Sequence, residues 1–261
     1  MKENGKGVKV GRTSPTLSHL MFADDLLLFG QATEDQMNCV KHILEQFCVL
    51  SGQKVSQEKT SIMFSKNVSR ETREDLRNIS GYRSTNSLGK YLGVPLLGRA
   101  PKKLDFQYII TQLQNKLTTW KAKNLSFAGR VTLVKSVIEA IPIYPMMTTN
   151  IPKSILQEIQ RLQRGFIWGD TMEGRRYHTV SWDVVTQPKH MGGLGLRRLD
   201  IMNKACLMKL GWELQNNGTN FWCSVLKGKY GRGVLNSVNA TAKPTDSSLW
   251  KALVSLWPLF D

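Results

Sequence analysis

The sequence lacks the residue patterns that mark several common protein classes. Its four cysteines, Cys39, Cys48, Cys206 and Cys223, include no Cys-x-x-Cys pair, and its four histidines are scattered. We therefore expect reduced core thiols and neither a disulfide framework nor a zinc site. No apolar run approaches the ~20 residues of a membrane-spanning helix, and residues 1–11 contain no apolar core of a secretory signal. These absences predict an intracellular protein without a membrane partner, and they do not distinguish nucleus from cytoplasm.

Acidic residues are scarce relative to basic ones. The chain of 261 residues has 36 Lys and Arg against 20 Asp and Glu, a formal net charge of +16. Such an excess favours nucleic acid as a partner, because cationic side chains that neutralise phosphates release bound counterions. A soluble basic protein and one bound to an anionic membrane surface remain the alternatives. The hydrophobic content, 41%, is enough for a packed core and for more than one compact unit.

Two adjacent carboxylates, Asp24 and Asp25, interrupt the apolar run from His19 to Phe29. The Leu- and Phe-rich flanks predict two buried strands joined by a tight turn at the two aspartates. A turn accounts for one Asp, but two neighbouring carboxylates repel each other unless a cation lies between them. Asp24 and Asp25 are therefore candidate ligands of Mg²⁺, or of Mn²⁺, in a two-metal phosphoryl-transfer site. A plain β-turn is the alternative.

The string Phe22-Ala23-Asp24-Asp25 resembles the catalytic box of reverse transcriptases from LINE-type (non-LTR) retrotransposons, particularly those of plants. The resemblance implies an RNA-directed DNA polymerase, with Asp24 and Asp25 as catalytic metal ligands. It also implies that Lys59, after Ser51-Gly52-Gln53, lies near the incoming triphosphate and assists proton transfer. A solvated lysine beside a strand is the alternative for Lys59.

The string Tyr91-Leu92-Gly93-Val94-Pro95 resembles the hairpin that grips the primer terminus in these polymerases. The resemblance makes Tyr91, Leu92 and Gly93 candidate primer-grip residues. An anonymous tight hairpin is the alternative, because glycine in a strand pattern indicates a bulge or a close backbone approach.

The region from Trp120 to Val137 resembles the thumb of the same plant enzymes, which lies over the template–primer duplex. The resemblance makes Lys121, Lys123, Arg130 and Lys135 candidate phosphate contacts, although each could equally be a solvated charge. Gly192-Gly193-Leu194-Gly195 lacks the strand and the Lys-Ser/Thr of a phosphate loop, so no nucleotide site is expected there.

Local signals predict the order of the elements. Capping residues and apolar spacing predict helices over 33–52, with a core stripe formed by Met37, Val40, Leu44 and Phe47, and over 69–81. Residues 53–64 are expected to form a strand. Helices are also predicted over 102–120, 126–142 and 152–169 and through 205–212, with loops over 170–195 and a Trp- and Gly-containing tail at the end. The first of these helices is expected to have an apolar stripe formed by Phe106, Ile109, Leu113, Leu117 and Trp120. The helix over 152–169 is expected to bury Ile155, Ile159, Leu162 and Phe166, and its ending, Phe166-Ile167-Trp168-Gly169, also resembles the family.

The expected fold is α+β, with an incomplete polymerase palm followed by a helical thumb and a loop-rich helical connector. The expected divisions are 1–100 for the palm (a small antiparallel sheet with packing helices), 101–169 for the thumb and 170–261 for the connector. In the family, the connector leads to a Cys/His-rich zinc segment that this chain does not reach.

The chemistry that the resemblance implies is incomplete in this chain. Before Asp24 the only acidic residue is Glu3, so neither a third metal-binding carboxylate nor a fingers segment is evident. We therefore expect a polymerase remnant that is inactive alone and that uses deoxynucleotides only if an upstream polymerase fragment complements it. The alternative is a non-catalytic basic module that binds an RNA template/DNA primer duplex. A gene fragment with no selected role is a third reading.

Overall fold

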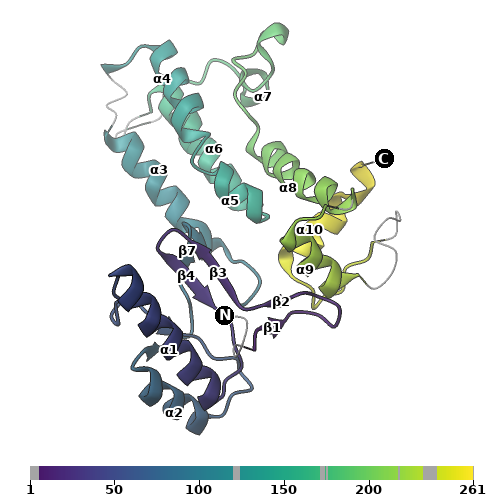
Figure 1. Cartoon of the computed structure of the whole chain (residues 1–261). Helices are drawn as coiled ribbons and strands as arrows, with labels where there is room; N and C mark the ends of the chain where they lie inside the picture. Colours follow the sequence, from purple (N-terminus) through teal and green to yellow (C-terminus); the bar gives the residue numbers. More distant parts are fainter. Residues whose placement is uncertain are drawn as a thin grey trace. The chain divides into compact units, whose positions relative to one another are not determined.

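A computed structural model describes residues 6–119, 124–170, 174, 176–216, 218–231 and 240–260. Within these residues, short strands and helices are mixed, so the predicted α+β class is confirmed (Figure 1). The expected sites Lys121 and Lys123 and the expected stripe residue Trp120 lie outside the described residues. The chain divides into two compact units. Unit 1 comprises residues 1–99 and 219–233, and unit 2 comprises residues 100–218 and 234–261.

The strands of unit 1 pair two by two. The antiparallel pairs are β1 (Val8–Lys9) with β2 (Thr16–Leu17), β3 (His19–Phe22) with β4 (Asp25–Leu28), and β7 (Lys90–Tyr91) with β8 (Val94–Pro95). The pair β5 (Ser61–Ile62) with β6 (Arg83–Ser84) is parallel. Each pair is a separate two-stranded sheet. The strand expected over residues 53–64 is therefore wrong for most of its length, because Thr60 donates to the Ser56 carbonyl (3.0 Å) and closes a local turn there.

The helices of unit 1 begin and end where their capping residues predict. In α1 (Glu34–Ser51), the Thr33 hydroxyl accepts from the Gln36 amide, and Gly52 ends the helix at φ 69°. In α2 (Arg70–Ser80), Ser69 and Gly81 have the same two roles, with Gly81 at φ 73°. The third helix is α9 (Phe221–Tyr230), against which the segment from Gly11 to Ser14 packs. A Cβ on Gly228 would overlap Ser14, so glycine at this position permits the close approach.

Unit 1 buries few apolar side chains. Among its described residues, only Leu76, Cys223 and Tyr230 are buried hydrophobic residues. The prediction of a core stripe on α1 is wrong, because no residue of that helix is buried and Phe47 is 48% exposed. Burial requires a covering surface as well as helical spacing, and the described part of unit 1 provides little of it.

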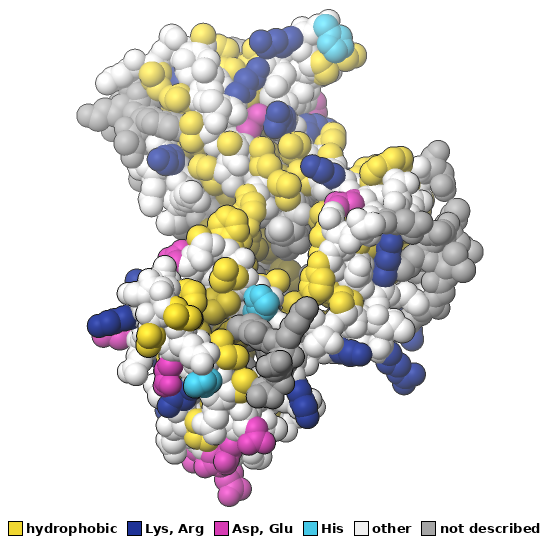
Figure 2. All heavy atoms as spheres, viewed as in Figure 1, with side chains coloured by type: hydrophobic (Ala, Val, Ile, Leu, Met, Phe, Trp, Pro, Cys, Tyr) yellow, Lys and Arg dark blue, Asp and Glu magenta, His cyan; other side chains and the backbone are white. Residues whose placement is uncertain are grey.

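The prediction that the β3–β4 hairpin is buried is also wrong. Met21 and Phe22 are 67% and 62% exposed. These strands pair only with each other in the described part of the chain. In Figure 2, apolar side chains reach the surface in the region where Figure 1 shows β3 and β4.

Unit 2 is mainly helical. Its helices, in order, are η1 (Lys103–Phe106), α3 (Gln107–Thr119), α4 (Phe127–Leu133), η3 (Val134–Ile138), α5 (Ile143–Thr148), α6 (Lys153–Trp168), α7 (Trp182–Val185), η4 (Lys189–Met191), α8 (Leu199–Gln215), α10 (Ser248–Leu256) and η5 (Trp257–Leu259). The helices predicted over 102–120 and 152–169 are confirmed over their described residues. The helix predicted over 126–142 ends earlier: α4 passes into η3, a turn of π-helix, and Pro142 then precedes a new helix, α5.

One core holds the first helices of unit 2 together. Phe106, Ile109 and Leu113 of the η1–α3 segment are almost completely buried, as are Ile155 and Ile159 of α6. The predicted apolar stripes therefore do face a common core. Figure 1 shows α3 beside α6, in agreement with their packing contacts.

Besides apolar packing by Leu199, a buried amide connects α8 to this helical core. Asn203 is 2% exposed, and its side chain makes three hydrogen bonds. Its Oδ1 accepts from the Ile151 amide (2.9 Å), and its Nδ2 donates to the carbonyls of Met146 and Thr149 (3.0 Å each). These three backbone groups lie in and after the last turn of α5, so Asn203 fixes the turn between α5 and α6.

The described part of the expected tail contains a capped helix, α10, that was not predicted from the sequence. Ser247 caps α10 by accepting from the Trp250 amide (3.2 Å), and Trp250, Leu253 and Trp257 are buried. The Phe260 ring lies against Gly211 of α8, where a Cβ would overlap it.

Candidate functional site

The two aspartates lie at the tip of the β3–β4 hairpin. Phe22 pairs with Asp25, so the turn consists of Ala23 and Asp24, one residue earlier than the sequence predicts. Ala23 has φ 51°, as tight hairpins require at their first central position. Among the described residues, only Ala23 and Leu92 are non-glycine residues with positive φ. Such a conformation costs of order 1–3 kcal/mol and is concentrated at functional sites.

Asp24 and Asp25 are exposed. Neither carboxylate makes a hydrogen bond or an ion pair with a side chain or backbone group of the described residues, although the Asp25 backbone pairs with Phe22. No group of three or more His, Cys, Asp or Glu side chains that could hold a metal ion occurs in the described part of the chain. The two carboxylates provide hard oxygen ligands of the kind that Mg²⁺ prefers, but they form only part of a metal site. No catalytic step follows from these two residues alone.

Lys59 is exposed and belongs to the turn before β5, where its amide donates to the Ser56 hydroxyl (3.4 Å). No hydrogen bond or ion pair joins Lys59 to Asp24 or Asp25. The predicted triphosphate role of Lys59 therefore remains a prediction.

The candidate primer-grip residues form a second tight hairpin in unit 1. Strands β7 and β8 are joined by Leu92 (φ 50°) and Gly93 (φ 82°). Positive φ at both central residues is the type I′ pattern, whose twist matches that of the paired strands. The Leu96 amide extends the pairing by donating to the Gly89 carbonyl (2.9 Å). The predicted hairpin is thus present, and its role toward a primer remains a prediction.

The two described candidate phosphate contacts, Arg130 and Lys135, are engaged inside unit 2. The Arg130 guanidinium lies against Gly169, which ends α6 at φ 75°. There it faces the negative end of the helix dipole. The Lys135 ammonium donates to the Leu194 carbonyl. Both cations therefore stabilise local structure, and a phosphate contact would be an additional role.

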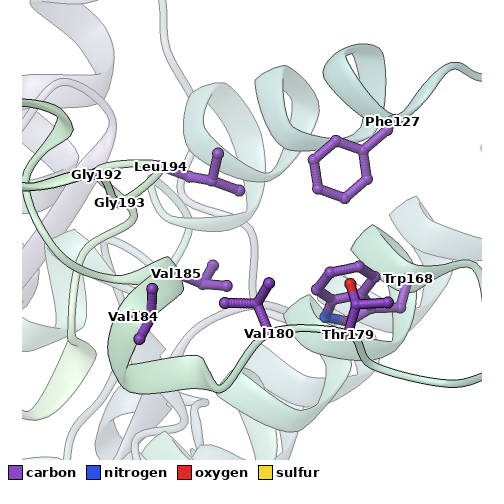
Figure 3. Close-up of a pocket in the computed structure, with 9 residues that line it drawn as sticks. All are labelled: Phe127, Trp168, Thr179, Val180, Val184, Val185, Gly192, Gly193 and Leu194. Atoms are coloured by element: carbon purple, nitrogen blue, oxygen red, sulfur yellow. The ribbon is translucent and has the colours of Figure 1, made fainter.

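A cavity of about 420 Å³ in unit 2 is a feature that sequence reasoning missed. Its aromatic wall is formed by Phe127 of α4 and Trp168 of α6, and Val180, Val184 and Val185 form an aliphatic wall. Figure 3 shows these side chains around one opening. The ring centroids of Phe127 and Trp168 are 5.5 Å apart.

Gly192, Gly193 and Leu194 complete the lining of the cavity. The Leu194 amide donates to the Val185 carbonyl (3.0 Å), and the Gly193 amide donates to the Pro188 carbonyl (3.2 Å). A Cβ on Gly193 would overlap the Gln187 carbonyl. The glycine string therefore permits a tight backbone crossing beside the cavity.

A buried carboxylate holds the segment that follows this wall. Glu139 is 4% exposed, and its Oε1 accepts from the Arg197 amide (2.8 Å). Burial raises the pKa of Glu139 above the ordinary glutamate value, against the smaller opposing effects of the Arg197 amide and of the Arg197 and Lys135 charges.

Comparison with known proteins gives an informative match. No protein-family profile matches the chain. A curated relative from Arabidopsis thaliana, named "Putative ribonuclease H protein", is 37% identical over 161 residues, which is 61% of this chain and 26% of the relative. The chain thus spans about a quarter of the length of that relative. None of the described helices has both the length and the apolar character needed to cross a membrane.

Proposed function

We propose that this chain is the later palm and thumb part of an RNA-directed DNA polymerase of a plant LINE-type retrotransposon. The observation that carries the proposal is the pair of exposed carboxylates at the tip of the β3–β4 hairpin, next to the strained Ala23. Support comes from the second tight hairpin, at Leu92 and Gly93, within the same unit. The name of the Arabidopsis relative, a ribonuclease H protein, is compatible with a protein that acts on nucleic acid.

In this proposal Asp24 and Asp25 contribute oxygen ligands to divalent cations. Bound Mg²⁺ or Mn²⁺ would supply charge stabilisation for nucleotidyl transfer. A third carboxylate must complete the site, and the described residues bring none near the pair. The chain alone therefore binds nucleic acid without extending it. Chemistry with deoxynucleotides requires an upstream polymerase segment.

A second candidate function is a basic module that binds an RNA/DNA duplex without any chemistry. The observations that favour it are the net charge of +16 and the incomplete metal site. The two candidates share the binding step and differ in whether Asp24 and Asp25 have a role.

Both candidates are tested by measuring the affinity of the purified chain for an RNA/DNA hybrid at increasing salt. We expect log K to fall linearly with log[salt], because phosphate contacts release counterions. The Asp24→Asn, Asp25→Asn variant is the matched control for the binding step. It is expected to bind the hybrid at least as tightly as the unchanged chain, because it loses two negative charges.

A flat salt dependence, or no binding at low salt, would contradict both candidate functions. The two candidates separate when Mn²⁺ is titrated into the bound complex. Only the polymerase reading predicts that Mn²⁺ tightens binding of the unchanged chain and does not tighten binding of the double variant.

A further inference from the structure

We propose that the cavity between α4, the end of α6 and the Gly192–Leu194 wall accepts one unstacked nucleobase of a bound nucleic-acid strand. The inference rests on the proposed nucleic-acid function and assigns it a specific contact. It is drawn from the lining of the cavity, from the charges beside it and from the way its walls are fixed.

The lining suits a flat aromatic ligand. Phe127 and Trp168 present two rings on one side, Val184, Val185 and Leu194 lie on the other, and Val180 lies between them near Trp168 (Figure 3). Aromatic side chains hold unstacked bases by stacking, and this contact tolerates every base because each base has a π-face. The Thr179 side chain also lines the cavity and adds a hydroxyl that can pair with a base edge.

The surroundings of the cavity suit an anionic strand. At the Trp168 end, Arg130 and Arg176 lie beside Gly169, with the Arg176 Cδ 3.9 Å from the position that a Cβ would occupy there. At the Leu194 end, the Lys189 Cγ and the Lys135 Nζ lie 3.5 and 3.7 Å from the corresponding position on Gly195. Cations therefore lie near both ends of an apolar cavity, where the phosphates flanking an inserted base would pass.

The acidic groups nearby are already engaged. Asp170 accepts from the Arg176 amide (3.0 Å) and lies 3.1 Å from the His178 Nε2. Glu139 is buried and accepts from the Arg197 amide. The exposed Asp183, next to Val184, lies 3.6 Å from the Arg198 guanidinium. Each of these carboxylates thus has a hydrogen-bond donor or a cation beside it that offsets part of its charge toward a strand.

The walls of the cavity are held in place without a ligand. Trp168 stacks on His178, with centroids 5.8 Å apart and an interplanar angle of 21°. The opposite wall is fixed by the Lys135 hydrogen bond to the Leu194 carbonyl and by the crossing at Gly193. A preformed site loses less entropy on binding than one that must be ordered.

The test is an abasic scan with the full chain. An RNA/DNA hybrid with a short single-stranded overhang is prepared with one abasic position moved, in turn, through the overhang and the junction. For the unchanged chain, we expect one position to weaken binding at least about fivefold, since stacking of one base on aromatic side chains is typically worth that much or more.

Two variants locate the effect. Val184→Phe adds a ring that fills the cavity, and because Val184 is 42% exposed the larger side chain does not have to enter a packed core. Ile201→Phe is the control, since Ile201 is an exposed residue of α8 that does not line the cavity. Val184→Phe should remove the sensitivity to the abasic position, whereas Ile201→Phe should retain it.

Three results would overturn the inference, and they separate it from the proposed function. A flat scan on the unchanged chain, with hybrid binding intact, would overturn the inference and leave the proposed function standing. Equal sensitivity in both variants would place the stacked base elsewhere on the chain. Absence of hybrid binding would overturn both proposals together.

Discussion

Replacing Asn203 with Ala should destabilise unit 2 strongly. The substitution removes three hydrogen bonds and leaves the Ile151 amide and the carbonyls of Met146 and Thr149 without that partner. Each buried polar group left unpaired costs roughly 1–3 kcal/mol. We therefore expect the free energy of unfolding to fall by about 4 kcal/mol.

Chemical denaturation, monitored by circular dichroism and by tryptophan fluorescence, measures this change in the free energy of unfolding. Asn203→Leu restores most of the lost volume without hydrogen bonds and should be about as destabilising as Asn203→Ala, if unpaired polar groups rather than a cavity are the cause. Lys204→Ala, at the exposed neighbouring position on α8, should change the unfolding free energy by less than about 0.5 kcal/mol. A loss below about 1 kcal/mol for both Asn203 variants would refute the reasoning.

The remaining predictions concern a buried acid, a glycine and the hairpin turn. Burial raises the pKa of Glu139 in the folded protein, so Glu139 binds a proton more tightly in the folded than in the unfolded state. The stability that Glu139 contributes is therefore present at low pH and is lost as pH rises from the ordinary glutamate pKa through the raised one. Denaturation curves across that range should show this slope, and Glu139→Gln should abolish it. Gly193→Ala should lower the melting temperature of unit 2, because a Cβ would overlap the Gln187 carbonyl. Ala23→Gly relieves a positive φ, so it should stabilise the β3–β4 hairpin or leave it unchanged, as amide exchange of β3 and β4 would show; faster exchange would contradict the assigned turn.

Local signals in the sequence located the ends of several helices correctly. Thr33, Ser69 and Ser126 each cap the helix predicted to follow them. A cap is a contact within one turn of chain, so its residues lie together in the sequence as well as in the fold.

The distant contacts could not be predicted in this way. The stripe on α1 has helical spacing, yet burial depends on a covering surface that periodicity does not reveal. The approach of Gly228 to Ser14 joins positions from opposite ends of the chain. Helix α10 was missed although Ser247 and the apolar residues that follow it carried the ordinary signals of a capped helix.

The candidate site was predicted only where it consists of short-range structure. The hairpins that carry Asp24 and Leu92 are short-range structures, and both are present. The cavity is not a short-range structure, because its Phe127, Trp168 and Leu194 come from three separate segments. The strings around Trp168 and Gly193 stood out in the sequence, but only the folded chain brings them together.

Primer extension by the purified chain tests the central claim most directly. The assay uses an RNA template, a DNA primer, deoxynucleotides and Mg²⁺ or Mn²⁺, with the Asp24→Asn, Asp25→Asn variant as control and hybrid binding measured in the same samples. The account predicts that both proteins bind the hybrid and that neither extends the primer. Extension by the unchanged chain that the double variant lacks would contradict it, because the two carboxylates would then complete a working site without a third.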